Sequence, residues 1–415
     1  MRAACAVEIS WMDRIGRSNY KIFSEGKIGN LALSNRLVRS ATWDPSILNS
    51  RMMTDEVLNL YRELAVGGVG LIITGGFPVY RERLPGEESG RSGYTYDDLQ
   101  VEAVERLAGA THNSRPDCKI VAQLETGYLN AGPSDISSPF SKERIRPLAI
   151  GEIRLMIDCF VEAIVRMKEA GFDGVQLHGA HGGLLSCFLS PYTNRRNDEY
   201  GGSTSNRTRI VREIIAGARE KVGNWPILIK MNCTDYIDGG IDMDTFPDLA
   251  KEIEASGVDA IEVSGGMWRC LTRSEAELGF RPVPAPESHT RIGRPEKQSY
   301  FLPYVERLNL NIPVILVGGN RNIERLEEII RQGRVDFIAL CRPLIREPNL
   351  PNRWLESLGK NTPECISCNS CIYNMMVHPG RPEPGLVTCL AKQDKQQHSQ
   401  AQEWLSSWVE KNVVR

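Results

Sequence analysis

The chain lacks several features that would assign it to a membrane, secreted or nucleic-acid-binding class. No stretch of its 415 residues approaches the ~20 continuous apolar residues that a membrane helix needs. Lysine and arginine form no long run and the formal net charge is -2, so the basic footprint of a nucleic-acid-binding protein is missing. The N-terminus has no clean apolar segment and carries acidic residues, unlike a signal peptide. We therefore expect a cytoplasmic protein with no membrane or nucleic-acid partner.

Internal repeats, low-complexity tracts and interdomain linkers are missing as well. The whole sequence is 41% hydrophobic and 25% charged, as in a soluble globular protein. Eleven cysteines are present, and those that lie singly in apolar runs read as small buried hydrophobes: Cys118, Cys159, Cys187, Cys233 and Cys341. Four others lie close together near the C-terminus, which favours metal binding in a reducing compartment over a disulfide framework.

Short β-rich runs alternate with amphipathic segments between residues 35 and 358. The predicted strands span 36–41, 69–74, 119–124, 174–178, 226–231, 260–264, 313–319 and 336–340. The predicted helices span 54–68, 97–113, 153–171, 205–223, 244–257, 299–310, 323–333 and 349–359. The strands are continuous apolar runs, as parallel strands buried on both faces should be. Eight such units predict an α/β protein with a (β/α)8 TIM barrel, and the lack of a G-x-G-x-x-G turn disfavours a doubly wound sheet.

The barrel leaves a segment at each end of the chain. We expect residues 1–34 to form a short N-terminal lid, 35–358 the barrel, and 359–415 a Cys-rich appendage with its own chemistry. Because barrel enzymes place their active sites at the C-terminal ends of the strands, the residues at those ends are the candidates for function.

The last two predicted strands end in segments that suit a phosphate. Gly318 and Gly319 follow the seventh strand, where backbone N–H groups without a neighbouring Cβ could approach an anion. Cys341 and Arg342 follow the eighth strand, and Arg342 would add a bidentate charged contact. Either segment alone would read as a plain turn or a surface arginine. Together, at the two positions where barrels bind phosphate, they predict a phosphate site.

Two other strand ends carry polar side chains that suit a planar ring. Gln123 ends the third predicted strand and could pair with an amide-like ring edge, although alone it would read as a packing amide. Lys230 ends the fifth, where a buried cation without an anionic partner would be costly. A fixed cation beside a reduced isoalloxazine tunes its potential. With the phosphate site, these residues predict FMN.

The chain resembles a known family from residue 20 to residue 358. The resemblance is carried, in order, by NRLVRSATW, GVGLIITGG, HGAHGGLLSCFLSPYTNRRNDEYGGSTSNRTR and the two phosphate segments. These segments are similar to the Old Yellow Enzyme group of FMN-dependent NAD(P)H:flavin oxidoreductases. The resemblance implies FMN contacts at Ser40, Ala41, Thr42, Gly76, Gln123, Lys230, Gly318, Gly319, Cys341 and Arg342. Lys230 would replace the usual arginine, which keeps the charge and loses the planar fork.

The same resemblance gives a role to two histidines that follow the fourth predicted strand. His178 and His181 would project above the flavin and hydrogen-bond the carbonyl oxygen of an α,β-unsaturated substrate, or an anion. Two N–H donors would stabilise the charge that develops on this oxygen as hydride adds to the β-carbon. No third ligand accompanies the pair, which disfavours zinc. Their position at a strand end disfavours two core histidines.

The sequence departs from the family pattern at the proton donor. Gly183 stands where many members carry a tyrosine that protonates the α-carbon, and glycine cannot do so. The segment QLETGYLN replaces the family's QLxHxGR, which would bring Glu125 and Tyr128 near the mouth of the site. Trp43 occupies the position that in the family is often Cys or Thr beside the flavin. We expect Tyr128, Glu125 or water to protonate the product, or the physiological substrate to differ.

The C-terminal cysteines predict a metal site. CISCNSC supplies Cys365, Cys368 and Cys371, and Cys389 follows a Pro/Gly-rich connection. C-x2-C-x2-C with a fourth thiolate suits a [4Fe-4S] cluster, and zinc held by four thiolates is the alternative. We expect the metal to order the appendage. We also expect serine at Cys368 to remove the metal and leave the flavin bound.

This segment resembles the cluster-binding segment of the 2,4-dienoyl-CoA reductase and trimethylamine dehydrogenase branch. The interval from Cys371 to Cys389 is longer than in that branch, and the sequence stops at Arg415 without the branch's FAD/NAD(P)-binding region. The leading expectation is an FMN enzyme that uses NADH or NADPH to reduce an activated C=C bond by ping-pong hydride transfer. Its substrate would be a small unsaturated or carbonyl compound, and homo-oligomers are compatible with it. The alternatives are a flavin/iron–sulfur amine-type dehydrogenase and a non-catalytic electron-transfer flavoprotein.

Overall fold

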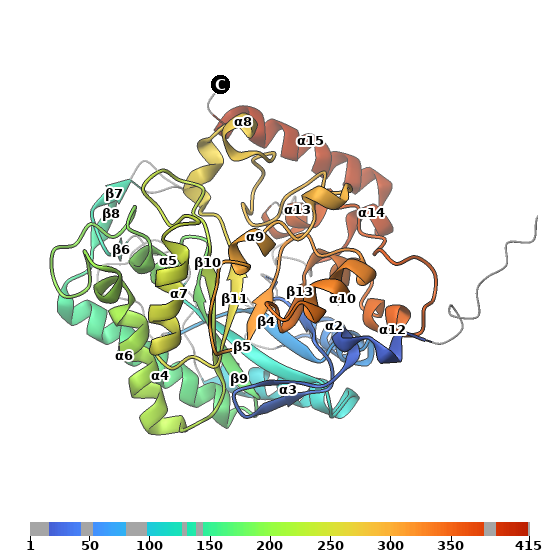
Figure 1. Cartoon of the computed structure of the whole chain (residues 1–415), viewed down its shortest axis with the longest axis horizontal. Coiled ribbons are helices and arrows are strands. Elements are labelled where there is room, and N and C mark those ends of the chain that lie inside the picture. The colour runs from blue at the N-terminus through green and yellow to red at the C-terminus, as the bar shows by residue number, and fades with distance from the viewer. Residues whose placement is uncertain are drawn as a thin grey trace, which may run out of the picture.

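The computed structural model describes residues 16–42, 53–79, 98–126, 131–137, 144–376 and 387–413. Eight parallel strands close into a barrel in the order β10-β11-β12-β13-β3-β4-β5-β9 (Figure 1). Their bounds are β3 Leu37–Arg39, β4 Leu71–Pro78, β5 Lys119–Glu125, β9 Gly174–Gly179, β10 Ile227–Asn232, β11 Ala260–Ser264, β12 Val314–Leu316 and β13 Phe337–Leu340. Every predicted strand overlaps one of these, so the predicted TIM barrel is confirmed.

Several helices surround the barrel. They are α2 Asp55–Val66, α3 Asp98–Ser114, α4 Ile150–Glu169, α6 Thr204–Val222, α7 Phe246–Ala255, α10 Ile323–Arg331 and α12 Leu350–Leu355. The side chains of Thr54, Ser203 and Asn322 accept hydrogen bonds from free N–H groups in the first turns of α2, α6 and α10. None of the helices in the described ranges is both long and apolar enough to span a bilayer.

One predicted helix is much shorter in the structure. The pattern at 299–310 predicted a full helix, but α9 covers only Leu302–Val305. Ser299 has φ +49° and lies outside the helical region, so the chain enters α9 late. Strand β12 also ends early, because Gly318 and Gly319 have φ of +101° and +72° and turn the chain out of the sheet.

Along each barrel strand, alternate side chains point inward, and their character changes from one end of the barrel to the other. Apolar side chains near the strand starts form one buried cluster with a hairpin, β1 Gly26–Ile28 and β2 Leu31–Leu33. The hairpin lies at the bottom of Figure 1, and its turn residue Gly29 packs against Asp259, which immediately precedes β11. It therefore covers the amino-terminal end of the barrel.

The carboxyl-terminal end carries the additional elements. These include α5 Leu184–Leu189, η4 Trp268–Thr272, α8 Glu275–Leu278, α13 Ser370–Met376, α14 Leu390–Gln393 and α15 Lys395–Asn412. Helix α15 lies next to α8 at the top of Figure 1, and Trp408 packs against the cluster that contains Leu271 and Leu278. The C-terminal appendage therefore rests on the long connection that follows β11.

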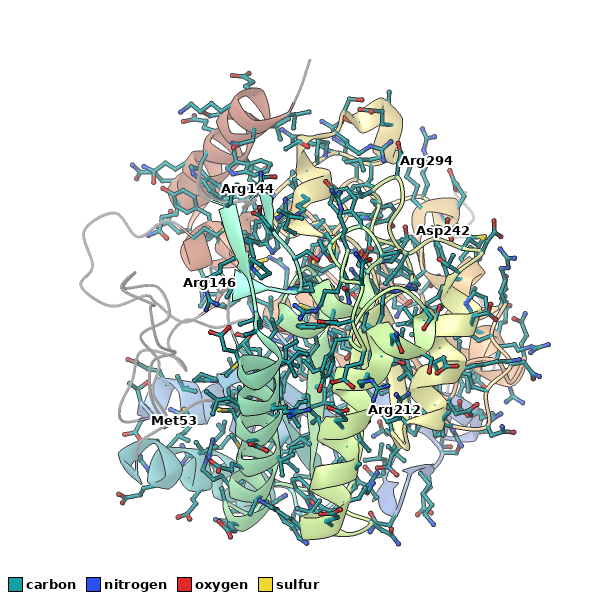
Figure 2. The ribbon with its side chains drawn as sticks, turned by 90° about the vertical axis from the view of Figure 1, so that its left-hand side faces the viewer. Met53, Arg144, Arg146, Arg212, Asp242 and Arg294 are labelled. Carbon is teal, nitrogen blue, oxygen red and sulfur yellow. The ribbon has the colours of Figure 1, made fainter. Side chains whose placement is uncertain are left out.

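A small sheet, β6-β8-β7, stands beside this end of the barrel. Strand β8 (Arg144–Pro147) pairs in parallel with β6 (Ala131–Gly132) and antiparallel with β7 (Ile136–Ser137). Figure 2 shows Arg144 and Arg146 on this sheet, above helix α4, and Arg146 pairs with Glu152 of α4 at 2.8 Å. The sheet is thus tied to the start of α4, which leads into β9 and the predicted histidines.

Candidate active site

A buried hydrogen-bonded chain crosses the upper part of the barrel interior. Lys230 Nζ donates to Ser40 Oγ at 2.9 Å, and Ser40 donates to Glu262 Oε1 at 2.6 Å. The other carboxylate oxygen of Glu262 accepts from Gln176 Nε2 at 2.7 Å, and Gln176 accepts from Gln123 Nε2 at 2.8 Å. Four strands and the end of β3 therefore contribute to one network, which contains three of the predicted FMN contacts.

Lys230 has an anionic partner, which corrects the interpretation made from the sequence. Its ammonium group lies 3.3 Å from Glu262 Oε1, and both side chains are buried. The register of the neighbouring strands β10 and β11 places Lys230 beside Glu262, a pairing that strand spacing alone does not reveal. Glu262 did leave a signal, because a carboxylate in the apolar run AIEVS is seldom fully buried without a partner.

The two predicted histidines meet at the end of β9. His178 Nε2 lies 3.3 Å from His181 Nδ1, and the rings are arranged edge to face. His181 Nε2 lies 2.8 Å from Ser264 Oγ, and the backbone N–H of His181 donates to Asn232 Oδ1 at 3.1 Å. His181 has φ +61°, an uncommon conformation for a non-glycine residue. Contacts from β10 and β11 therefore fix the ring of His181 beside that of His178.

His181 is a neutral imidazole in this setting. Burial holds the pKa of His181 well below its usual range, and the charges of His178 and Lys230 act in the same direction. A neutral ring carries one N–H and one acceptor nitrogen. With Nδ1 accepting from His178 Nε2–H, the remaining N–H of His181 faces Ser264. A ligand oxygen that enters between the rings would accept a hydrogen bond from His178 Nε2–H. It would accept a second one from His181 when the proton of that ring moves from Nε2 to Nδ1.

The far side of His178 faces a carboxylate and a space left by glycine. His178 Nδ1 is buried without a hydrogen bond of good geometry, and Glu125 Oε2 lies 3.3 Å from it. A Cβ at Gly183 would lie 3.4 Å from the same nitrogen, so a side chain there would reach this spot. A Cβ at Gly76 would collide with the Glu125 carboxyl group, so glycine at 76 lets Glu125 approach His178. Tyr128 and Trp43 lie outside the described residues.

The predicted phosphate end is built from the loops after β12 and β13. A Cβ at Gly318 would lie 2.6 Å from the Phe301 ring, and one at Gly319 would lie 2.8 Å from the Tyr300 ring. Thr42 Oγ1 lies 3.1 Å from Cys341 Sγ, which joins the end of β3 to the start of the β13 loop. Ala41, next to Thr42, packs against the apolar interior of the barrel. The residues predicted from two distant segments are therefore neighbours.

The burial and the partners of the Arg342 side chain show whether a phosphate could bind here. Its side chain is buried, it donates to Asn369 Oδ1, and no carboxylate of the described residues lies within ion-pair distance. A buried guanidinium without an anion in direct contact is costly, so an anion such as a phosphate would suit this place. Arg321, two residues after Gly319, was missed from the sequence, and none of the described carboxylates forms an ion pair with it. The FMN phosphate fits both arginines.

Two of the predicted metal ligands contact arginines, Cys365 through its backbone carbonyl and Cys389 through its thiol. Arg321 donates to Ser367 Oγ at 2.6 Å and to the Cys365 carbonyl, and Cys389 Sγ lies 3.6 Å from Arg346 Nη1. Burial raises the pKa of Cys371, which Arg342 opposes. Within the described ranges, no three His, Cys, Asp or Glu side chains are gathered as a metal site. The donors are thiols beside cations, a chemistry that suits thiolate ligands, and metal binding stays a prediction.

Comparison with curated proteins gives matches over most of the chain. It is 34% identical to an NADH oxidase of Thermoanaerobacter brockii over 368 residues, 85% of this chain and 53% of that protein. It is 31% identical to a metal reductase of Desulforamulus reducens, covering 89% of this chain and 53% of that protein. An NADPH dehydrogenase of Listeria monocytogenes is 32% identical and is covered over 96% of its length. The chain thus spans about half the length of the first two relatives.

Solved structures with the same fold include a 2-naphthoyl-CoA reductase complex, with a TM-score of 0.71 and 24% identity over 84% of this chain and 54% of that one. Histamine dehydrogenase from Rhizobium sp. 4-9 has a TM-score of 0.67 and 25% identity over 85% of this chain and 50% of that one. The family model that describes NADH:flavin oxidoreductases and NADH oxidases matches residues 21–361. The chain therefore belongs to the NADH:flavin oxidoreductase / NADH oxidase family of FMN-dependent enzymes.

Proposed function

We propose that this enzyme takes reducing equivalents from NADH or NADPH and reduces a C=C bond conjugated to a carbonyl group. The observation that carries the proposal is the histidine pair at a strand end, in which Nε2 of His178 lies 3.3 Å from Nδ1 of His181 and the neutral ring of His181 is fixed by Ser264 and Asn232. The N–H of His178 Nε2, which points toward the other ring, would stabilise the oxygen that becomes negative when hydride reaches the β-carbon, and His181 would add a second donor when its proton is on Nδ1.

The flavin would be held by residues already described. Arg342, Arg321 and the backbone of Gly318 and Gly319 would take the phosphate, and Lys230 would face the ring. FMN, when bound, accepts a hydride from the nicotinamide and passes it to the second substrate. The Glu262 carboxylate would moderate the charge of Lys230, so that the cation beside the ring is paired rather than free.

The proton for the product would reach the site through Glu125 and His178. Glu125 Oε2 lies 3.3 Å from His178 Nδ1, so the two groups are close enough to exchange a proton during the reaction. His178 can pass a proton to the space between the two rings and regain one from Glu125, which is 19% exposed and in contact with solvent. With this route, the reaction needs no proton donor at position 183, where this chain has glycine. Tyr128 remains a second candidate for the donor.

The test combines the two half-reactions. Anaerobic NADH and NADPH should bleach the flavin absorbance, and an added enone should restore it. The double variant His178→Ala/His181→Ala should be reduced at the normal rate, and enone should reoxidise it at least tenfold more slowly, an effect of the size of a lost oxyanion donor. His112→Ala is the matched control, because His112 pairs with Asp173 outside the site. Equal reoxidation of the double variant and wild type would refute the role of the pair.

A second candidate is amine dehydrogenation, in which the substrate reduces the flavin. We include this reaction because the chain is 25% identical to histamine dehydrogenase over 85% of its length. The same anaerobic experiment separates the candidates. Bleaching by small primary amines, with no reoxidation by enones, would support the amine reaction. No reaction with any donor or acceptor would favour an electron-transfer flavoprotein.

We also propose that Cys365, Cys368, Cys371 and Cys389 hold a metal, with a [4Fe-4S] cluster preferred to zinc. Support comes from the C-x2-C-x2-C spacing and from the cations that lie beside the thiols, Arg342 and Arg346. Anaerobically purified protein should contain about four iron and four sulfide per chain, the content of one such cluster. Stoichiometric zinc without iron would select the alternative.

A further inference from the structure

The phosphate arginines are held by the segment that carries the first three cysteines. We call residues 365–371 the cysteine loop. Arg342, which begins the short helix α11 (Arg342–Arg346) just after β13, donates to the side chain of Asn369, which lies between Cys368 and Cys371. Asn369 is 1% exposed, has φ +61° and donates in turn to the Ser288 carbonyl at 2.6 Å. Its amide therefore joins the cysteine loop to Arg342 and to the connection after β11.

The second arginine is held by the same loop. Arg321 Nη1 donates to Ser367 Oγ at 2.6 Å, and Arg321 Nη2 donates to the carbonyl of Cys365. Ser367 is 3% exposed and has φ +55°, so this side of the loop is also fixed in an uncommon conformation. Both guanidinium groups thus take their orientation from acceptors on the cysteine loop, and neither has a carboxylate partner in the part of the chain that the structure describes.

We propose that the cysteine loop is a working part of the flavin phosphate site, so that metal at the cysteines and FMN at the barrel stabilise each other. Asn369 and Ser367 are positioning residues that hold Arg342 and Arg321 for the phosphate. This inference rests on the proposed FMN and metal sites and adds the coupling between them. It reverses the expectation from the sequence that serine at Cys368 would leave the flavin bound.

The physical basis is the cost of orienting a flexible, buried cation. An arginine side chain loses considerable rotamer freedom when it is fixed, and acceptors that fix it in advance lower the cost of binding an anion. Ligation would fix the positive-φ residues Ser367 and Asn369, because metal binding orders the segment between its ligands. Linkage is reciprocal, so bound FMN must raise the equilibrium affinity for the metal by the same factor by which the metal raises the affinity for FMN.

The first experiment measures flavin retention. FMN release from the holoenzyme is followed by the fluorescence of free flavin after dilution, and the dissociation constant is obtained by titrating FMN back. Asn369→Ala should raise the constant about tenfold, the order expected for a hydrogen bond to a charged group. Asn352→Ala is the matched control, since its amide donates to the Val66 carbonyl on the outer surface, and the constant should not change.

A double-mutant cycle tests whether Asn369 acts through Arg342. Arg342→Ala alone should weaken FMN binding by 10-fold or more, the effect of losing a charged phosphate contact. Asn369→Ala added to Arg342→Ala should then change the constant less than about twofold, because the partner it positions is gone. A full tenfold effect in both backgrounds would overturn the positioning role. Thermal unfolding of each variant separates these effects from a loss of fold.

The second experiment removes the metal. Treating wild-type holoenzyme with a chelator, or preparing Cys368→Ser, should speed FMN release about tenfold, and saturating FMN should slow metal loss to the chelator. Unchanged release after measured metal loss would overturn the coupling, and so would a protein that contains no metal. An unchanged constant in Arg342→Ala would instead refute the phosphate site itself. The two failures are therefore distinct, and the chelator arm needs no variant to fold.

Discussion

The two ends of the barrel interior are built by the same strands and differ in kind. Near the strand starts, Val38, Leu71 and Leu228 pack with Leu33 of the hairpin in one apolar cluster. Two residues farther along β3 and β10 stand Ser40 and Lys230, in a hydrogen-bonded chain with Glu262. Because inward positions recur every second residue, a step of two along a strand moves from a packed core to a polar site.

This difference separates the groups that stabilise the fold from those that can bind a ligand. The apolar end needs nothing further, since its side chains fill the barrel and the hairpin covers them. The polar end holds buried groups whose requirements the described residues do not meet, such as His178 Nδ1 and the guanidinium of Arg342. A substitution at the first end should change stability alone, and one at the second should change ligand binding as well.

The largest effect is expected from Lys230→Met. The variant leaves Glu262 buried without its cation, and breaking a buried pair in this way costs about 3–5 kcal/mol. Denaturant unfolding should show this loss, and flavin retention should fall too, because Lys230 stands at the polar end. Glu262→Gln combined with Lys230→Met should recover most of the stability but not the flavin. Recovery of both would mean that Lys230 has only a structural role.

Leu33→Ala should destabilise the apolar end of the barrel interior and leave the polar end unchanged. Leu33 is 1% exposed and lies in the cluster under the barrel, so the cavity should cost about 3 kcal/mol in the free energy of unfolding. The dissociation constant of FMN and the rate of flavin reduction by NADH should equal those of wild type in the folded protein. A change in either would show that the two ends are not independent.

His289→Phe should alter how stability depends on pH. The His289 ring is stacked between Phe280 and Tyr300 at 3.7 and 4.0 Å, and burial lowers the pKa of His289 to about 3. The unfolded chain binds a proton at this residue below about pH 6.5, while the folded protein stays neutral. Stability is therefore lost as pH falls from 6.5, by about 2 kcal/mol at pH 5.

Phenylalanine removes this contribution and keeps the stack. Between pH 7 and pH 5, the His289→Phe variant should lose about 2 kcal/mol less than wild type in denaturant unfolding. His181, whose pKa burial also lowers, stays in both proteins and contributes equally to each. Parallel stability curves for the two proteins over this range would contradict the prediction.

The sequence was sufficient for the fold because buried parallel strands and capped helices leave local patterns. The same patterns located His178, His181, Lys230 and Arg342 at strand ends. Gln176 and Glu262 were missed, because their roles depend on which strands lie opposite inside the barrel. The contact of Arg342 with Asn369 was missed for a related reason, since it joins the barrel to an appendage whose position no local pattern encodes.

The smallest change in stability is expected at the polar end, from Gly183→Ser. Gly183 precedes the first turn of α5 with φ −62°, so serine meets no backbone strain there and can cap the helix, which adds a few tenths of a kcal/mol. Its Cβ would lie 3.4 Å from His178 Nδ1, a nitrogen without a hydrogen bond of good geometry. A serine hydroxyl in this space would compete with Glu125 for His178 and should slow reoxidation by enones while flavin reduction by NADH stays the same. A loss of stability above about 1 kcal/mol, beyond what a cap position allows, would show that the space beside His178 is packed rather than open.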